Sequence, residues 1–195
     1  MRVIVITAPD FLPGEAPILA TLLAWGADRI HLRKPGCKEQ ALVRLIEQLP
    51  DWCYPRLSLH DHFQLQARYG IGGIHLNGRN PAPPPGYRGM VSRSCHSLDE
   101  VERYKPFADY VFLSPVFDSI SKAGYRGAFT RQELDGAARR GIIDHKVVAL
   151  GGVSAQKMPQ VHAWGFGGVA LLGAVWEHCR TVDDAKRVLS GLSGQ

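Results

Sequence analysis

The stretch YVFLSPVFDSISKAG, residues 110 to 124, joins an apolar run to a polar loop. Tyr110–Ser114 has the aromatic and β-branched composition of a buried strand. Ser119, Ser121 and Lys122 follow it, so two hydroxyl groups and one ammonium group fall within four positions. Such side chains donate hydrogen bonds to phosphate oxygens and neutralise their charge. The stretch therefore predicts a strand that carries an anion-binding loop at its carboxyl end.

Apolar runs of this kind alternate with helical patterns along the chain, which indicates βαβ units and a parallel sheet. Ser97 with Glu100, and Thr130 with Glu133, have the spacing of a capping box at a helix start. The expected strands are Val3–Thr7, Arg29–Arg33, Arg56–His60, Gly73–Leu76, Val91–Ser94, Tyr110–Ser114, Val147–Leu150 and Gly168–Leu171. The expected helices are Ala16–Trp25, Glu39–Leu49, Ser97–Tyr104, Thr130–Ala138, Ser154–Trp164 and Val182–Leu192.

Eight expected strands predict an α/β fold, a compact TIM (β/α)8 barrel formed by residues 1–195 as a single domain. The chain is shorter than the roughly 250 residues typical of such barrels. We expect the helix after the fourth strand to be missing or shortened, because Pro81, Pro83, Pro84 and Pro85 exclude it. An open doubly wound sheet is the alternative fold.

The composition is that of an ordinary globular protein, with 45% hydrophobic and 21% charged residues. No apolar run is long enough to span a bilayer, and the N-terminal residues 1–10 become polar too soon for a signal peptide. We therefore expect a cytoplasmic protein with no membrane partner. Its four cysteines lie far apart and are expected to be reduced thiols.

The net charge is +5, which raises the question of a nucleic-acid partner. Basic residues never run beyond adjacent pairs such as Arg33 with Lys34 and Arg139 with Arg140. Because no basic stripe with interleaved aromatic residues appears, we expect no nucleic-acid binding. The charge instead favours small phosphate and diphosphate ligands, and the sequence is compatible with a homo-oligomer.

In a barrel of this type the functional site lies at the carboxyl ends of the strands. Glycine backbone N–H groups there can bind phosphate at a helix start, although a turn that needs positive φ also explains a glycine pair. The residues expected at this end of the barrel are Arg33, Lys34, His60, Asp61, Asn77, Asn80, Ser94, His96, Ser119, Ser121, Lys122, Gly151, Gly152 and Gly173.

A carboxylate and two histidines add acid/base and metal chemistry to this set. Asp61 beside phosphate groups predicts a magnesium ligand, and the alternative is an N-cap for a helix over 63–69. His31 alternates with Ile30 and Leu32 in a strand, so it faces the barrel interior. His31 and His96 are proton-transfer candidates, and the alternative for each is a packed, hydrogen-bonded histidine.

Taken in order, these motifs resemble the thiamine phosphate synthase/TenI family, which includes thiamine-phosphate pyrophosphorylases. The motifs are HLRKP, LHDH, IHLNGRN, SCHSLDE, ADYVFLSPVFDSISK and LGG. Synthases of the family couple an aminopyrimidine diphosphate (HMP-PP) to thiazole phosphate and release pyrophosphate. The resemblance implies pyrophosphate contacts from Arg33, Ser119, Ser121 and catalytic Lys122, a magnesium site at Asp61, a site-lining Ser94, and thiazole-phosphate contacts from Gly152 and Gly173.

The chain also departs from the synthase pattern. His31 stands where synthases usually have Gln, His60 where they have Asn, and Asn80 where they have the second metal-ligand Asp. Pro35 replaces a family Lys, for which Lys34 is the expected substitute. Losing a carboxylate weakens magnesium binding.

Two alternatives to the synthase therefore stand. The TenI branch, a thiazole tautomerase acting on thiazole carboxylate phosphate, has His in the motif strand and a stretch similar to SCHSLDE. It implies acid/base roles for His31 and His96 and no cofactor. A catalytically silent barrel that binds a phosphate ligand is the other alternative. The Ser-x-Ser-Lys loop favours the synthase.

Overall fold

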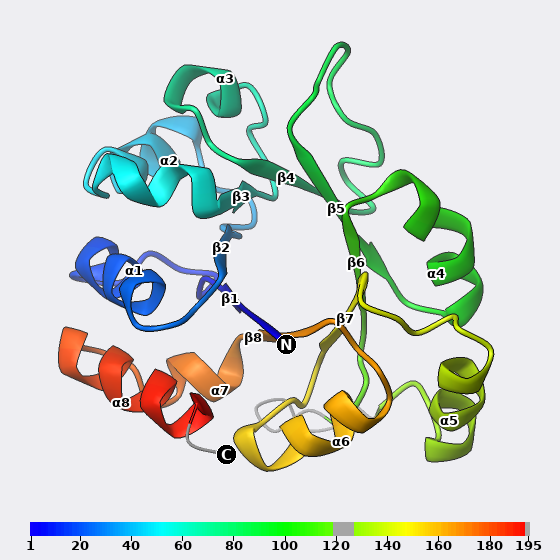
Figure 1. Cartoon of the computed structure of the whole chain (residues 1–195). Helices are drawn as coiled ribbons and strands as arrows, with labels where there is room; N and C mark the ends of the chain where they lie inside the picture. Colours follow the sequence, from blue (N-terminus) through cyan, green and yellow to red (C-terminus); the bar gives the residue numbers. More distant parts are fainter. Residues whose placement is uncertain (119–126, 194–195) are drawn as a thin grey trace.

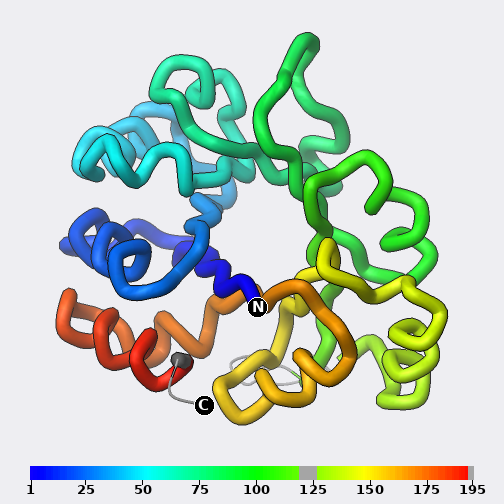
Figure 2. The backbone as a smooth tube through the Cα atoms, in the orientation of Figure 1, coloured from blue at the N-terminus to red at the C-terminus, as the bar shows by residue number. Residues whose placement is uncertain are grey.

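Eight parallel strands close into a barrel in the computed structural model, which describes residues 1–118 and 127–193 (Figure 1). The first and last strands pair in parallel, with Val3 opposite Val169, so the sheet has no free edge (Figure 2). The predicted (β/α)8 barrel is confirmed and the open-sheet alternative is wrong. The strands are β1 Arg2–Ile6, β2 Arg29–Leu32, β3 Leu57–Leu59, β4 Gly73–Leu76, β5 Met90–Cys95, β6 Tyr110–Leu113, β7 Val147–Leu150 and β8 Gly168–Leu171.

Helices surround the barrel on its outside (Figure 1). Both expected caps are present: Ser97 accepts a hydrogen bond from the Glu100 backbone, and Thr130 and Glu133 form a capping box. The α-helices are α1 Glu15–Ala24, α2 Glu39–Ile46, α3 Leu65–Tyr69, α4 Leu98–Tyr104, α5 Arg131–Arg139, α6 Met158–Ala163, α7 Gly173–Trp176 and α8 Val182–Ser193. Short 3-10 helices cover Asp51–Arg56, Lys105–Phe107 and Ala155–Lys157.

The barrel is shortened where the prolines predicted it. Residues 77–89, which join β4 to β5, contain no helix. The helix α7 is not among the expected helices, because a four-residue segment has too little sequence to show a helical period. Tertiary contacts form it instead: Val175 and Trp176 are buried, and the Trp176 indole N–H donates to the Ile6 carbonyl at 2.7 Å.

The barrel interior is divided into an apolar half and a polar half. Strands β1, β6, β7 and β8 supply the apolar cluster of Ile4, Ile6, Tyr110, Phe112, Val148 and Ala170. Strands β2 to β5 supply His31, Ser58, His75 and Ser92, each at most 1% exposed. Alternate residues of a strand face opposite sides, so the intervening residues pack outward against the helices. The sequence thus builds one half of the interior from hydrogen-bonding side chains.

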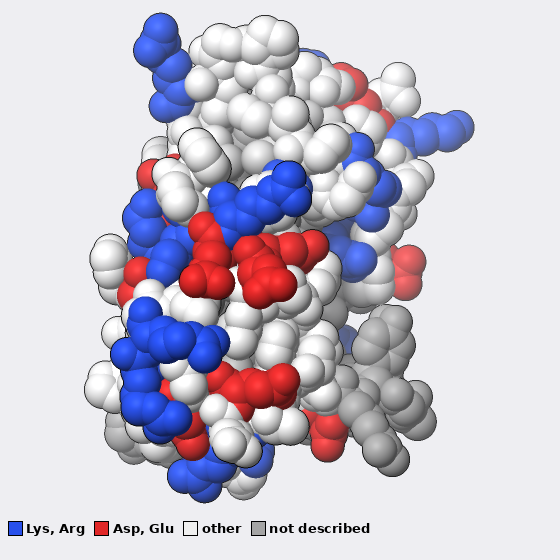
Figure 3. All heavy atoms as spheres, turned by 90° about the vertical axis from the view of Figure 1, so that its right-hand side faces the viewer, with Lys and Arg blue, Asp and Glu red and all other residues white. Residues whose placement is uncertain are grey.

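The surface on the side of α4 and α5 carries mixed charge. Figure 3 shows Lys and Arg side chains interspersed with Asp and Glu over this face. Among the described residues, no helix has both the length and the apolar character needed to cross a membrane.

Candidate active site

A pocket of about 480 Å³ opens at the carboxyl end of the barrel. All eight strands contribute to it, through residues at or directly after their ends. Its lining combines apolar side chains with arginine, histidine, serine, amide and carboxylate groups. The lining residues are Ile6, Arg33, His60, Asn77, Gly78, Arg79, Arg93, Ser94, His96, Glu100, Tyr104, Phe112, Ser114, Leu150 and Leu172.

Five of the residues predicted from sequence line this pocket: Arg33, His60, Asn77, Ser94 and His96. Asp61 and Asn80 lie beside it, hydrogen-bonded to each other at 2.9 Å. Ser119, Ser121 and Lys122 lie outside the described residues, so their placement stays a prediction.

Arginines that the sequence reasoning did not select complete the pocket's basic character. Arg79 follows β4 in the loop that also carries Asn77 and Asn80, and Arg93 lies within β5. Arg93 stacks on Tyr104, with 3.7 Å from its guanidinium carbon to the ring centroid, and its Nε is buried without a partner among the described residues. The position of Arg79 directly after a strand could have identified it from the sequence. Arg93 could not be identified in this way, because its contact with Tyr104 depends on how α4 packs.

Arg33 is available to an anion. Its side chain is partly buried and has no hydrogen-bond partner among the described residues. Burial and the positive charge of Arg79 lower the pKa of Arg33, while Asp61 opposes them. Two guanidinium groups near each other repel, and an anion bound between them relieves that repulsion.

The residues expected to bind magnesium are engaged in hydrogen bonds, in an arrangement that does not fit a magnesium ion. Both carboxylate oxygens of Asp61 accept hydrogen bonds from Arg79, at 3.0 Å to Oδ2 and 3.3 Å to Oδ1. The Asn80 amide nitrogen donates to Asp61 Oδ1 and to the His60 carbonyl, at 2.9 and 3.0 Å. Asn80 therefore presents a donor where a metal needs an acceptor. The N-cap alternative for Asp61 is also absent, because α3 begins after Gln64 with no side-chain cap.

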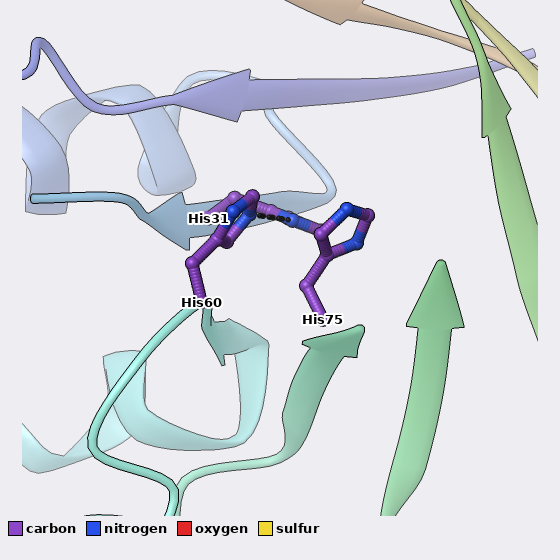
Figure 4. A group of neighbouring side chains, drawn as sticks. All are labelled: His31, His60 and His75. Atoms are coloured by element: carbon purple, nitrogen blue, oxygen red, sulfur yellow. Dashed lines mark hydrogen bonds between the residues drawn. The ribbon is translucent and has the colours of Figure 1, made fainter. Parts of the chain in front are cut away.

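Three histidines meet under the pocket, inside the barrel. His60 and His75 extend from the ends of β3 and β4 towards His31 on β2 (Figure 4). His31 Nδ1 lies 2.9 Å from His60 Nε2, and His31 Nε2 lies 2.7 Å from the Tyr110 hydroxyl. His31 thus faces the interior as predicted, but it lies beneath the pocket and reaches it through His60.

The tautomer of His75 follows from its partners. The Ser92 hydroxyl donates to the Ile74 carbonyl at 3.2 Å, so it accepts from His75 Nδ1 at 2.8 Å. His75 Nε2 is then the acceptor for the Ser94 hydroxyl, also at 2.8 Å. Burial lowers the pKa of His75 to about 3. Burial, with the neighbouring histidines, holds the pKa values of His31 and His60 well below their usual range, so the cluster is neutral.

The ring arrangement of this cluster does not suit a metal ion. Nitrogen atoms of His31, His60 and His75 lie within 4.8 Å of one another, which brings metal-ligating groups together. However, the rings of His60 and His75 stack with centroids 4.2 Å apart and an interplanar angle of 21°. A metal binds in the plane of each imidazole, and two stacked, nearly parallel planes offer no shared position. The cluster is a hydrogen-bonded stack.

His96 is exposed and lines the pocket. Its Nδ1 lies 3.1 Å from the Ser114 carbonyl, which can only accept, so Nδ1 carries a proton. In the neutral ring Nε2 is then the basic atom. This geometry suits a residue that takes up or releases a proton in the pocket.

The remaining predicted residues are held within the fold. Lys34 is 2% exposed, and its ammonium donates to Glu15 and to the Ala8 and Asp10 carbonyls rather than lining the pocket. Gly151 and Gly152 adopt φ values of 93° and 63°, so their turn needs glycine whether or not phosphate binds. Neither they nor Gly173 line the pocket, although the preceding Leu150 and Leu172 do.

The fold and the pocket define the class of protein: a (β/α)8 barrel with a polar pocket built by all eight strand ends. The chain belongs to the thiamine monophosphate synthase (TMP-TENI) family, whose model matches residues 3–175. It is 28% identical over 170 residues to a thiamine-phosphate synthase of Photorhabdus laumondii, covering 80% of this chain and 76% of that protein. It is also 29% identical over 175 residues to a putative thiamine-phosphate synthase of Geobacter sulfurreducens, covering 83% of this chain and 81% of that protein.

A solved structure agrees with this membership. The thiamine phosphate pyrophosphorylase of Bacteroides thetaiotaomicron superposes with a TM-score of 0.89 and 37% identity, covering 99% of this chain and 96% of that chain. The Pyrococcus furiosus thiamine phosphate pyrophosphorylase, at a TM-score of 0.77 and 19% identity over 99% of this chain and 96% of that one, shows the same fold.

Proposed function

We propose that the protein is a thiamine phosphate synthase, a transferase that couples an aminopyrimidine diphosphate to thiazole phosphate. The observation that carries this proposal is one pocket whose lining combines Arg33, Arg79 and Arg93 with apolar side chains. The guanidinium groups suit a diphosphate, and the apolar side chains suit an aromatic pyrimidine. The curated relatives named thiamine-phosphate synthase support the same reaction class.

The reaction breaks the bond between the pyrimidine methylene carbon and the diphosphate oxygen. The electron pair leaves with pyrophosphate, and the thiazole nitrogen supplies the pair for the new carbon–nitrogen bond. Arginine side chains stabilise the departing negative charge. The carbon centre becomes electron-poor as the bond breaks, so a neutral wall is favourable there. His60 and Ser94 supply such a wall, because the lowered pKa of His60 keeps its ring uncharged.

A thiazole tautomerase is the second candidate, and His96 is the observation that favours it. A tautomerase removes a proton at one position of the substrate and returns one at another. The exposed, pocket-lining His96 has a basic Nε2 for this purpose. His31 would act only through His60, because it does not line the pocket.

One experiment separates the candidates. The purified protein is incubated with aminopyrimidine diphosphate and thiazole phosphate, once with magnesium chloride and once with EDTA, and in a parallel sample with thiazole carboxylate phosphate. We expect thiamine phosphate, detected by its oxidised fluorescence, together with an equal amount of pyrophosphate. Isomerisation of thiazole carboxylate phosphate without any coupling would make the protein a tautomerase, and binding without turnover of either substrate would make it a silent barrel.

A further inference from the structure

Arg79 lies between a carboxylate and the pocket. Its Nε and Nη2 groups lie 3.4 and 3.0 Å from Asp61 Oδ1 and Oδ2. Its Nη1 group has no hydrogen-bond partner among the described residues, and Arg79 lines the pocket. A guanidinium held by one edge in this way keeps further N–H donors for a second anion.

Asn80 holds the carboxylate that holds Arg79. Its amide nitrogen donates to Asp61 Oδ1 and to the His60 carbonyl, which uses both amide hydrogens. A flipped amide would set its oxygen against two acceptors, so the hydrogen bonds fix its orientation. The Asn77 side-chain oxygen accepts from the Arg79 and Asn80 backbone N–H groups, at 2.9 and 3.1 Å, and thereby fixes the turn.

We infer that Arg79 takes the place of a divalent cation at this site: it binds a phosphate oxygen of the diphosphate substrate through Nη1, and Asp61 is its positioning residue rather than a metal ligand. The identity of the diphosphate rests on the proposed function. At this site the Arg79 side chain supplies the positive charge that a bound metal ion would otherwise supply. Diphosphate binding therefore needs no magnesium.

The charges around Arg79 support this role. Arg33 lies close enough for the positive charge of Arg79 to lower its pKa. Among the described residues, Asp61 pairs with Arg79, and its charge also raises the pKa of Arg33. Glu100 lines the same pocket but accepts a hydrogen bond from the His96 backbone N–H. The site is therefore short of negative charge without a ligand, and a phosphate group supplies it. A magnesium ion would add positive charge to a place where the single carboxylate is already paired.

Pyrophosphate binding measured by titration calorimetry tests the inference. We expect the dissociation constant of the unmodified protein to be the same in EDTA and in magnesium chloride. Arg79→Gln should weaken binding about tenfold to a hundredfold in both buffers, because a charge-assisted hydrogen bond is lost. Arg88→Gln is the matched control, since Arg88 lies exposed in the same connection and does not line the pocket.

A second variant replaces the Arg79 cation with a pair of possible metal ligands. Arg79→Ala combined with Asn80→Asp removes the Arg79 guanidinium and leaves two carboxylates, Asp61 and the new one, so we expect its pyrophosphate binding to depend on magnesium. Asp61→Asn, which frees Arg79, should weaken binding in EDTA. If magnesium tightens binding by the unmodified protein about tenfold or more, or Arg79→Gln binds normally, the inference is wrong.

These outcomes are distinct from failure of the proposed function. Thiamine phosphate formed only with magnesium would overturn the role of Arg79 and leave the synthase intact. Magnesium-independent pyrophosphate binding that Arg79→Gln weakens, without any coupling activity, would support the site and overturn the synthase.

Discussion

Two ion pairs in this barrel look alike in sequence and differ in the structure. Lys34 with Glu15 is almost wholly buried, at 2.6 Å with side chains 1% and 2% exposed. Arg79 with Asp61 lies beside the pocket, at 3.0 Å with side chains 54% and 20% exposed. The Lys34 ammonium has acceptors for all its donors within the fold, whereas Arg79 has donors without a partner in the described part of the chain. The difference teaches that unused donors, rather than charge or position after a strand, mark the basic residue that is free to bind a ligand.

Removing Lys34 gives the largest expected effect on stability. Lys34→Met leaves the Glu15 carboxylate buried without a counter-charge, so the free energy of unfolding should fall by about 3–5 kcal/mol. Urea denaturation at neutral pH measures this loss. In the double variant Lys34→Met with Glu15→Leu most of the stability should return, because no unpaired charge remains. A single variant as stable as the parent protein would mean that the pair is not a structural element.

Gly152 tests whether a predicted phosphate contact is required by the fold alone. Its φ is 63°, and a Cβ atom there would meet the Asp118 carbonyl at 2.2 Å and Phe117 at 2.8 Å. Gly152→Ala should therefore lower the free energy of unfolding by about 2–3 kcal/mol, from backbone strain and the displaced neighbours.

Gly165→Ala is the control for Gly152, measured in the same urea experiment. Gly165 has a φ of 80°, and a Cβ atom there has no neighbour within 4 Å. Gly165→Ala should therefore lower the free energy of unfolding by only about 1 kcal/mol, from backbone strain. Equal losses in both variants would show that the close approach at Gly152 does not matter for stability.

The buried histidines can be compared with the two ion pairs, because they are buried polar groups without a charged partner. The pKa of His75 is about 3 in the folded protein and 6.5 in the unfolded reference. Between these values the unfolded state binds the proton more readily, so stability falls as pH falls through this window. His75 alone should contribute a slope of about 1.4 kcal/mol per pH unit. Urea midpoints measured across this range give the slope.

His75→Asn should reduce the slope by that amount, because one titrating group is removed. His162→Asn is the control, since His162 is exposed and its substitution should leave the slope unchanged. A slope unaffected by His75→Asn would mean that His75 carries its proton in the folded protein.

The fold was predictable because its signals are local. Apolar runs such as Val147–Leu150 and Gly168–Leu171 match the observed strands, and the prolines mark the missing helix. For the site, the sequence predicted only that its residues lie at the carboxyl ends of the strands. It did not show which hydrogen-bond donors are engaged within the fold, because their partners are distant in sequence. Lys34 pairs with Glu15 across 19 positions, and Asp61 pairs with Arg79 across 18. No periodicity in the sequence carries that information.

Removing Arg79 should have the smallest effect on stability. Exposed ion pairs contribute about 0–1 kcal/mol, because water screens them and the long side chain loses conformational freedom on pairing. Arg79→Gln should therefore unfold within about 1 kcal/mol of the parent protein in urea, although pyrophosphate binding is weakened. A loss as large as that expected for Lys34→Met would place Arg79 among the residues that hold the fold. A small loss with impaired binding would separate the two ion pairs by role, since one stabilises the barrel and the other serves its ligand.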